Sequence, residues 1–132
     1  MAVVVDTDVV SYLFKADSRA RWYRPRLARQ LRLVSFMSLA ELDHWALAHH
    51  WGQPRQESFE RFLQGFEIVY ADRVLCRLWA EVTDRTRRKG GPMDVADAWI
   101  AATALALRVP LVTHNPEDYA SVDGLTLISE EP

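Results

Sequence analysis

The sequence predicts a three-layer α/β protein, with helices on both faces of a central, mostly parallel sheet of four or five strands. Short apolar runs rich in β-branched residues alternate along the chain with longer segments whose apolar residues recur every three or four positions. Strands that alternate with helices form parallel sheets, because each helix carries the chain back to the start of the next strand. The 132 residues are expected to form a single domain, residues 1–132, without an internal repeat or linker.

Five short apolar runs, each bounded by capping or turn residues, are expected to be the strands. The first consists of three consecutive valines, which is typical of a fully buried strand. The second alternates loosely, the third and fourth follow predicted helices, and the fifth follows a turn at residues 115–118. In chain order the strands are expected at residues 3–5, 31–36, 67–70, 109–113 and 125–128.

Helices are expected where a capping residue precedes apolar residues at helical spacing. The residues expected to begin them, in chain order, are Thr7 or Asp8, Ser18, Ser38, Pro54, Asp72 and Asp94. We expect Pro25 to break or restart the second helix, residues 18–30, and Gly52 to end the third. The sixth helix, residues 95–107, is rich in alanine and almost wholly apolar, so it must be buried on most of its circumference.

The composition excludes several classes of protein. A single cysteine, Cys76, excludes a disulfide framework within the chain and a cysteine-rich zinc site, and it suits a reducing cytoplasm. No apolar run approaches the ~18 residues that span a bilayer, and no basic segment precedes an apolar stretch at the N-terminus. We therefore expect a cytoplasmic protein outside the membrane. The formal net charge of -2 excludes a polycation that binds nucleic acid by bulk attraction.

Three acids occupy positions that a parallel sheet would bring together. Asp6 ends the first strand, whereas Glu41 and Asp97 lie in the first turns of the third and sixth helices. Strand ends and the starts of the following helices face one edge of the sheet, where ligands bind. Asn115, just past the fourth strand, reaches the same edge. We expect these four side chains to form one site.

Most of these acids also have a purely structural interpretation. Ser38 and Glu41 have the spacing of a capping box, Asp97 suits the positive end of a helix, and Asp8 suits a cap. Together, however, carboxylates ~4 Å apart repel by ~4 kcal/mol at an effective dielectric of ~20, so a cluster favours a bound cation or shared protons. An oxygen-only cluster suits Mg²⁺ or Mn²⁺, which can activate water and neutralise charge during phosphodiester hydrolysis.

Four segments, in this order and at these distances, resemble the PIN-domain ribonucleases, and specifically the VapC-type toxins of bacterial toxin–antitoxin pairs. The segments are V-V-V-D-T-D-V-V-S at 3–11, S-L-A-E-L at 38–42, D-A-W-I-A-A-T-A-L-A-L at 97–107 and L-V-T-H-N-P-E-D-Y at 111–119. The resemblance covers nearly the whole chain. It implies a compact PIN fold and a Mg²⁺- or Mn²⁺-dependent endoribonuclease that hydrolyses RNA phosphodiester bonds.

By position, the resemblance implies that Asp6, Glu41 and Asp97 are catalytic acids and metal ligands. Asn115 stands at a fourth catalytic position that is commonly Asp in the family. The asparagine removes one negative charge, which implies a lower metal affinity or a second metal held only with oxygens from RNA phosphate. Asp118 can compensate for the missing charge, although a structural role is the alternative.

Three further residues are expected to act as auxiliary groups. Thr7 and Thr113 place hydroxyls beside the acids, where either can orient a metal-bound water. Asp8 is expected to be a cap or a group that supports the ligands from behind.

Basic residues and family resemblance predict the partners. Arginines are frequent between residues 19 and 32, where there is no acid, and the ones expected to hold RNA phosphates are Arg19, Arg21, Arg24 and Arg26. A solvated helix face is the alternative for these arginines. The resemblance implies a homodimer and a VapB-like antitoxin. The antitoxin's peptide is expected in a groove between the N-terminal helices, drawing on apolar residues such as Leu13, Trp45 and Phe62.

Other functions fit parts of the sequence. A haloacid-dehalogenase-like phosphatase would use Asp6 in D-T-D-V as its nucleophile, but it would need a lysine and paired acids after later strands, and it leaves Glu41 unexplained. A receiver-like binding module would need an acceptor aspartate after the third strand, which Asp72 matches only loosely. A PIN-fold module that binds RNA or antitoxin but has lost activity through Asn115 is the third alternative.

Overall fold

The structure is a computed structural model that describes residues 1–130. Five strands form one sheet in the order β3–β2–β1–β4–β5, and every neighbouring pair is parallel. The strands are β1 (Ala2–Val5), β2 (Leu31–Ser35), β3 (Glu67–Val69), β4 (Leu111–Val112) and β5 (Leu127–Ile128). The predicted parallel sheet is thereby confirmed.

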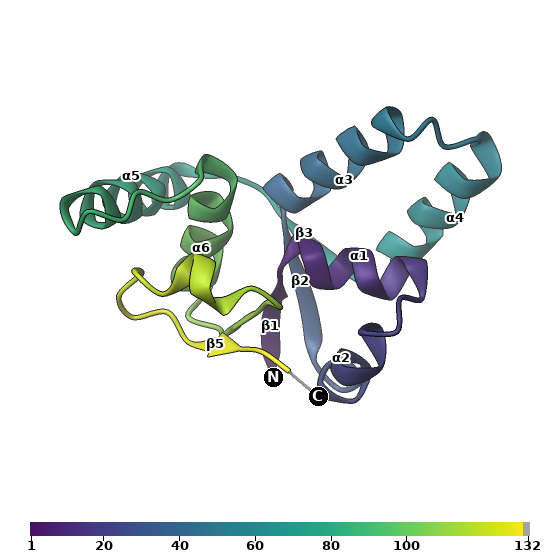
Figure 1. Ribbon diagram of the computed structural model, residues 1–132, viewed down its shortest axis with the longest axis horizontal. Helices are drawn as coiled ribbons and strands as arrows, with labels where there is room; N and C mark the ends of the chain where they lie inside the picture. The colour runs from purple at the N-terminus through teal and green to yellow at the C-terminus, as the bar shows by residue number, and fades with distance from the viewer. Residues whose placement is uncertain (131–132) are drawn as a thin grey trace.

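Helices cover both faces of this sheet (Figure 1), as the alternating pattern predicted. One side carries α1 to α4 and the other carries α5 and α6, which pack against each other. The helices are α1 (Thr7–Lys15), α2 (Ala20–Leu27), α3 (Phe36–Ala48), α4 (Gln53–Leu63), α5 (Arg73–Arg88) and α6 (Val95–Leu107), with a short 3-10 helix η1 (Pro116–Tyr119) after β4. None of the helices in residues 1–130 is long and apolar enough to span a membrane.

The valine run of β1 is uniformly apolar because it is buried on both faces. Val3 and Val5 belong to a core formed with α1, α2 and α4, whereas Val4 belongs to a second core on the α6 side. All three valines are at most 3% exposed. Side chains alternate across a strand, so only a strand between two helical layers needs an apolar residue at every position.

The predicted burial of α6 is also confirmed. Six of its residues are buried, and four of these are alanines. Small side chains let a helix approach its neighbours closely, and α6 packs against α5, α3 and the sheet. Asp94 caps α6 by accepting the N–H of Ala96 over 2.9 Å, as expected. The first turn of α6 is thereby fixed at the edge of the sheet where the strands end.

Several predicted helix boundaries are wrong. Helix α3 begins at Phe36 rather than Ser38, because the hydroxyl of Ser35 caps it by accepting the N–H of Met37 over 3.0 Å. The helix ends at Ala48, and Gly52 is the N-cap of α4 instead of the end of α3. Each error arises from the choice between neighbouring residues that are all able to cap a helix.

Helix α2 is shorter than predicted and is not broken. Pro25 lies inside it, two residues before its end, so the proline removes one backbone hydrogen bond from a helix that is about to stop. Strand β4 is also shorter than predicted, because Pro110 has no N–H for the ladder and only Leu111 and Val112 pair with β1.

Candidate active site

The candidate site lies at the point where the strand order reverses. The chain fills the sheet from β1 outward to β3, and then returns to place β4 and β5 on the other side of β1. Asp6 follows β1, Thr113 follows β4, and the N–H of Asp6 donates to the carbonyl of Val112 over 2.9 Å. In open parallel sheets, ligands bind outside the carboxyl ends of the strands at such a reversal.

Asp6 is held by three hydrogen bonds and is only 7% exposed. Its Oδ1 accepts the N–H of Thr7 over 2.8 Å, which makes Asp6 the N-cap of α1. Its Oδ2 accepts the hydroxyls of Thr113 over 2.8 Å and Tyr119 over 3.1 Å. Burial, followed by the charge of Asp8, raises the pKa of Asp6 to about 7. Asp6 is therefore fixed in place and poised to bind a proton or a cation.

Asp97 approaches Asp6 from the first turn of α6. Its Oδ1 lies 3.3 Å from the hydroxyl of Tyr119, the same hydroxyl that donates to Asp6. Burial raises the pKa of Asp97 to about 6, with further contributions from the charges of Asp94 and Asp118. The structure thus brings Asp6 and Asp97 to opposite sides of one tyrosine hydroxyl, as the sequence predicted for the acids but not for the tyrosine.

Glu41 faces the same edge from α3. The capping box predicted for Ser38 and Glu41 does not form, because α3 begins earlier with Ser35 as its N-cap, which places Ser38 inside the helix and Glu41 beyond the predicted first turn. Both side chains instead contact Thr7, whose Oγ1 lies 2.7 Å from Ser38 Oγ and 2.8 Å from Glu41 Oε1. One Thr7 proton cannot serve both partners. With Glu41 ionised, Ser38 therefore donates to Thr7 and Thr7 donates to Glu41. Burial, with the charges of Asp94 and Asp8, raises the pKa of Glu41.

Asp8 does not cap α1, contrary to one of the predictions, because Asp6 occupies that position. Its Oδ2 accepts the side-chain N–H of Asn115 over 2.7 Å and the backbone N–H of His114 over 3.1 Å. Burial raises the pKa of Asp8. Asp8 thus ties the start of α1 to the segment after β4. The Asn115 amide reaches the predicted edge, where it is engaged by Asp8.

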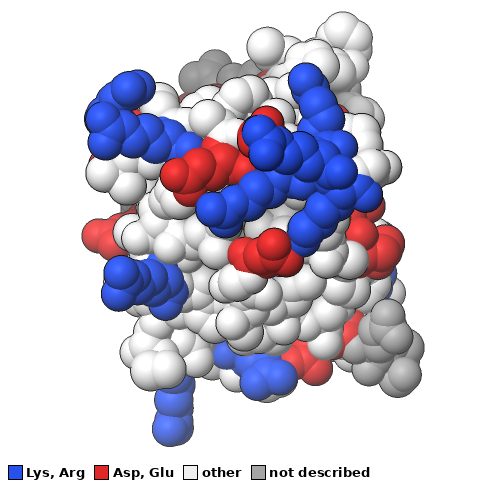
Figure 2. Space-filling model, turned by 90° about the vertical axis from the view of Figure 1, so that its left-hand side faces the viewer, with Lys and Arg blue, Asp and Glu red and all other residues white. Residues whose placement is uncertain are grey.

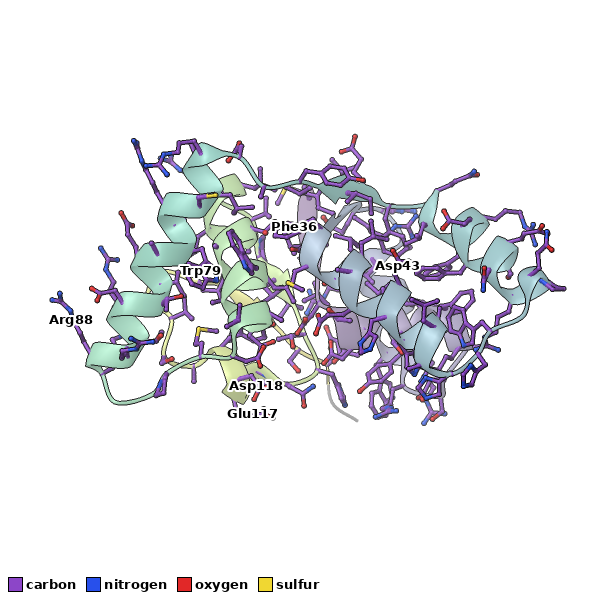
Figure 3. The ribbon with its side chains drawn as sticks, turned by 90° about the horizontal axis from the view of Figure 1, so that it is seen from above. Phe36, Asp43, Trp79, Arg88, Glu117 and Asp118 are labelled. Carbon is purple, nitrogen blue, oxygen red and sulfur yellow. The ribbon has the colours of Figure 1, made fainter. Side chains whose placement is uncertain are left out.

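Thr113 and Asp118, which were also predicted to belong to the site, have different surroundings. Thr113 is fully buried and, besides its bond to Asp6, accepts the N–H of Asn115 over 3.1 Å. Asp118 lies exposed on η1 (Figure 3), and it acts on the site through its charge, which contributes to the raised pKa of Asp97. Thr113 is therefore part of the framework of the site and Asp118 lies at its margin.

Tyr119 is the residue that sequence reasoning missed, since it stands in the sequence only as the last residue of the fourth PIN-like segment. It is 1% exposed and its hydroxyl contacts two of the acids. Burial and the charges of Asp6 and Asp97 raise its pKa, so it stays protonated. The available signal was a hydroxyl-bearing aromatic residue four positions past Asn115, on a turn at the same edge of the sheet.

The four arginines predicted to bind RNA have different surroundings. Arg19 forms an ion pair with Asp17 over 2.9 Å, and its guanidinium lies 3.9 Å above the ring of Tyr12. Arg26 forms an ion pair with Glu130 over 2.7 Å. Within residues 1–130, Arg21 and Arg24 form no ion pair. RNA binding by these arginines stays a prediction.

Basic residues also gather at the outer end of α5, from which Arg88 extends in Figure 3. They are Arg85, Arg87, Arg88 and Lys89. The surface on this side of the molecule carries basic side chains interspersed with acids (Figure 2). Arg88 forms an ion pair with Asp84 over 3.0 Å, and Lys89 forms one with Asp123 over 2.6 Å. This surface is therefore partly neutralised.

A cavity of about 490 Å³ lies between α1, α2 and α4. Apolar side chains form much of its wall, with two arginines beside them; the main lining residues are Leu13, Arg24, Leu27, Arg32, Phe62 and Phe66. Leu13 and Phe62 are thus brought together as the predicted groove requires. Trp45 lies elsewhere, against Trp51 and beneath the ammonium of Lys15.

The donor set of the site fits Mg²⁺ or Mn²⁺, which prefer oxygen ligands. Asp6, Glu41 and Asp97 offer carboxylates, and within residues 1–130 none of them forms an ion pair with Lys or Arg. In the same residues, no three acidic, His or Cys side chains lie close enough together to enclose an ion on their own. Mg²⁺ usually keeps several waters and takes one or two carboxylates together with substrate phosphates, so a more open arrangement is suitable.

Known proteins with similar sequences identify the family of this chain. The family model described as "PIN domain" matches residues 3–125. The chain is 31% identical to VapC ribonuclease Y4jK of Sinorhizobium fredii, over 96% of each protein. It is 27% identical to Ribonuclease VapC1 of Haemophilus influenzae, over 95% of each.

Among solved structures, the chain is similar to VapBC2 from Rickettsia felis, which was crystallised bound to a DNA fragment from its promoter. The TM-score is 0.87 and the sequence identity is 22%, over 99% of this chain and 100% of the other, which shows a shared fold. The family match spans nearly the whole chain, including the four acid-bearing segments. The chain therefore belongs to the PIN domain family, in which its relatives are VapC ribonucleases.

Proposed function

We propose that the protein is a metal-dependent endoribonuclease and the toxin of a toxin–antitoxin pair. The observation that carries this proposal is the presence of Asp6, Glu41 and Asp97 at the edge of the sheet where the strand order reverses, with the pKa of each raised. Burial and neighbouring charges disfavour the ionised form of these carboxylates, and a bound divalent cation would stabilise that form. The ribonuclease names of its relatives support RNA as the substrate.

Each acid has a distinct part in holding Mg²⁺ or Mn²⁺. Asp6 is the most rigid, because three hydrogen bonds fix both of its oxygens. Asp97 and Glu41 approach from α6 and α3, and a hydroxyl orients each of them. When bound, the cation would polarise the scissile phosphodiester and lower the pKa of a bound water.

The reaction adds water across a phosphodiester bond of RNA: a phosphorus–oxygen bond forms to the water oxygen, which loses a proton, and the bond to the 3′ oxygen breaks. The 3′ oxygen takes up a proton from solvent and leaves as a hydroxyl. Glu41 is suited to accept the proton of the water through the carboxylate oxygen that Thr7 does not contact. Asn115 keeps this edge less negative than an aspartate would, which favours the approach of an anionic phosphate.

The second part of the proposal concerns partners. A VapB-like antitoxin would occupy the cavity beside Leu13 and Phe62, where two arginines favour an antitoxin segment that combines acidic and apolar residues. The same family relationship supports a homodimer. The single free cysteine, Cys76, and an RNA substrate both suit the cytoplasm.

The phosphatase alternative lacks a suitable lysine. Lys15 lies over Trp45 and Lys89 is paired with Asp123, and these are the two lysines of the chain. An inactive PIN module is a stronger alternative, because Asn115 is engaged by Asp8 and offers no extra carboxylate.

An RNA cleavage assay tests the proposed function. Purified protein is mixed with total RNA and either Mg²⁺, Mn²⁺ or EDTA, and the cut ends are mapped by sequencing. We expect discrete cuts with Mg²⁺ or Mn²⁺ and none with EDTA. Cuts that persist in EDTA would overturn the metal-dependent mechanism. Mn²⁺ binding without any cleavage would favour the inactive module.

A further inference from the structure

Tyr119 carries the one hydroxyl in residues 1–130 that contacts carboxylates from two different elements. Its single proton can be donated to Asp6, which follows β1, over 3.1 Å, or to Asp97 in α6 over 3.3 Å, and Asp6 has two other donors. Thr113 and Thr7, by contrast, each contact a single acid. The tyrosine hydroxyl therefore links two parts of the site that approach from different layers of the fold.

Packing accounts for the ring of Tyr119 but not for its hydroxyl. The ring lies in the second core with Val4, Ile100 and Leu111, where a phenylalanine would fill the same space. A buried hydroxyl is unfavourable unless it is hydrogen bonded, and within the described residues its partners are the two acids. The placement of this hydroxyl thus points to the site rather than to the core.

The two acids depend on Tyr119 to different degrees. Asp6 also accepts hydrogen bonds from Thr7 and Thr113, so it stays anchored when the tyrosine hydroxyl is removed. For the Asp97 side chain, Tyr119 is the one hydrogen-bond partner in residues 1–130. Loss of the hydroxyl would therefore free Asp97 to rotate while leaving Asp6 in place.

We infer that Tyr119 is a positioning residue that holds the Asp97 carboxylate against Asp6, so that both face one divalent cation. The inference rests on the proposed function, because it takes the site to bind Mg²⁺ or Mn²⁺. Carboxylates that bind metals are themselves oriented by hydrogen bonds, and loss of such a partner typically costs about 10- to 100-fold in metal affinity or activity.

The test compares Tyr119→Phe with the wild-type protein. Mn²⁺ affinity is measured by calorimetry, and metal-free crystal structures of both proteins give the rotamer of Asp97. Tyr23→Phe is the matched control, because Tyr23 is also fully buried and its hydroxyl contacts His114 and Glu130 rather than an acid of the site. Thermal unfolding of both variants measures the loss that follows from removing a buried hydroxyl alone.

We expect Tyr119→Phe to bind Mn²⁺ about tenfold more weakly, with Asp97 turned away from Asp6, and Tyr23→Phe to bind Mn²⁺ like the wild type. An unchanged Mn²⁺ affinity in Tyr119→Phe, or an Asp97 that keeps its rotamer, would overturn the inference. If the wild-type protein itself bound no Mn²⁺, the proposed function would fail, and the crystal structures would still decide whether Tyr119 positions Asp97.

Discussion

The side-chain amide of Asn115 donates a hydrogen bond to Oδ2 of Asp8 over 2.7 Å. This contact shows what the asparagine does at the position for which the family resemblance implied an acid. Asp8 is a buried carboxylate with a raised pKa and needs donors, and Asn115 supplies one from the segment after β4. An aspartate here would instead place a second negative charge beside Asp8.

We therefore predict that Asn115→Asp destabilises the metal-free protein by about 1 to 2 kcal/mol at pH 8, because it exchanges a hydrogen bond for repulsion between two partly buried carboxylates. Urea unfolding in EDTA measures the loss. Asn115→Ala is the control, since it removes the hydrogen bond without adding charge. Added Mn²⁺ should reduce the difference in unfolding free energy between wild type and Asn115→Asp, but not the difference between wild type and Asn115→Ala. Equal stability of wild type and Asn115→Asp in EDTA would contradict the prediction.

The pH dependence of stability follows from the raised pKa values of Asp6, about 7, and Asp97, about 6. Both values lie above the 3.8 of an unperturbed aspartate, so the folded protein binds more protons than the unfolded chain between about pH 4 and 7. The metal-free protein should therefore lose stability as the pH rises through this range. For Asp6 the loss should be on the order of 4 kcal/mol.

Urea unfolding in EDTA at pH 5 and pH 8 tests this prediction. Asp6→Asn carries no titrating group at this position, so its stability should fall less between the two pH values. Excess Mn²⁺ should reduce or reverse the trend, because a cation binds the deprotonated carboxylates. If the wild-type protein became more stable with rising pH in EDTA, Asp6 and Asp97 would not control the pH dependence of its stability.

The cavity between α1, α2 and α4 leads to a prediction about the antitoxin. Arg24→Glu reverses a charge in its wall and should weaken binding of a coexpressed VapB-like antitoxin by about tenfold or more, because like charges now meet at the interface. Arg29→Glu, an exposed change elsewhere on the same segment, is the matched control. Titration by surface plasmon resonance gives both affinities. If the two variants bound equally well, the antitoxin would lie elsewhere.

The parallel sheet and the position of Asp6 could be predicted because each depends on a short local pattern: a run of valines, and an acid directly after it. Val3, Val4 and Val5 must be buried on both sides, and Asp6 directly after them lies at the end of a strand wherever that strand pairs. Asp97 in the first turn of α6 then lies near Asp6, because the parallel topology brings strand ends and helix starts to one edge. Glu41 lies one turn further into α3 than predicted, because α3 begins at Phe36.

The connections between these acids were less predictable, since they depend on distances across the chain. Ser38 and Glu41 have the spacing of a capping box, but Ser35 caps α3, and both side chains instead contact Thr7 of α1. Similarly, no local pattern shows that Tyr119 reaches Asp97. Hydrogen bonds between elements require the positions of both partners, which a local pattern does not supply.

The most direct test of the account is RNA cleavage by Asp6→Asn in the presence of Mn²⁺. Asp6 is the most constrained acid of the site, and the substitution keeps its shape while removing its charge. The control is Asp43→Asn, on the exposed part of α3 (Figure 3), with both variants first shown to be folded by circular dichroism. We predict that Asp6→Asn cleaves RNA about 100-fold or more slowly than wild type, whereas Asp43→Asn cleaves at the wild-type rate. Cleavage by Asp6→Asn at the wild-type rate would contradict the claim that this acid site is the catalytic centre.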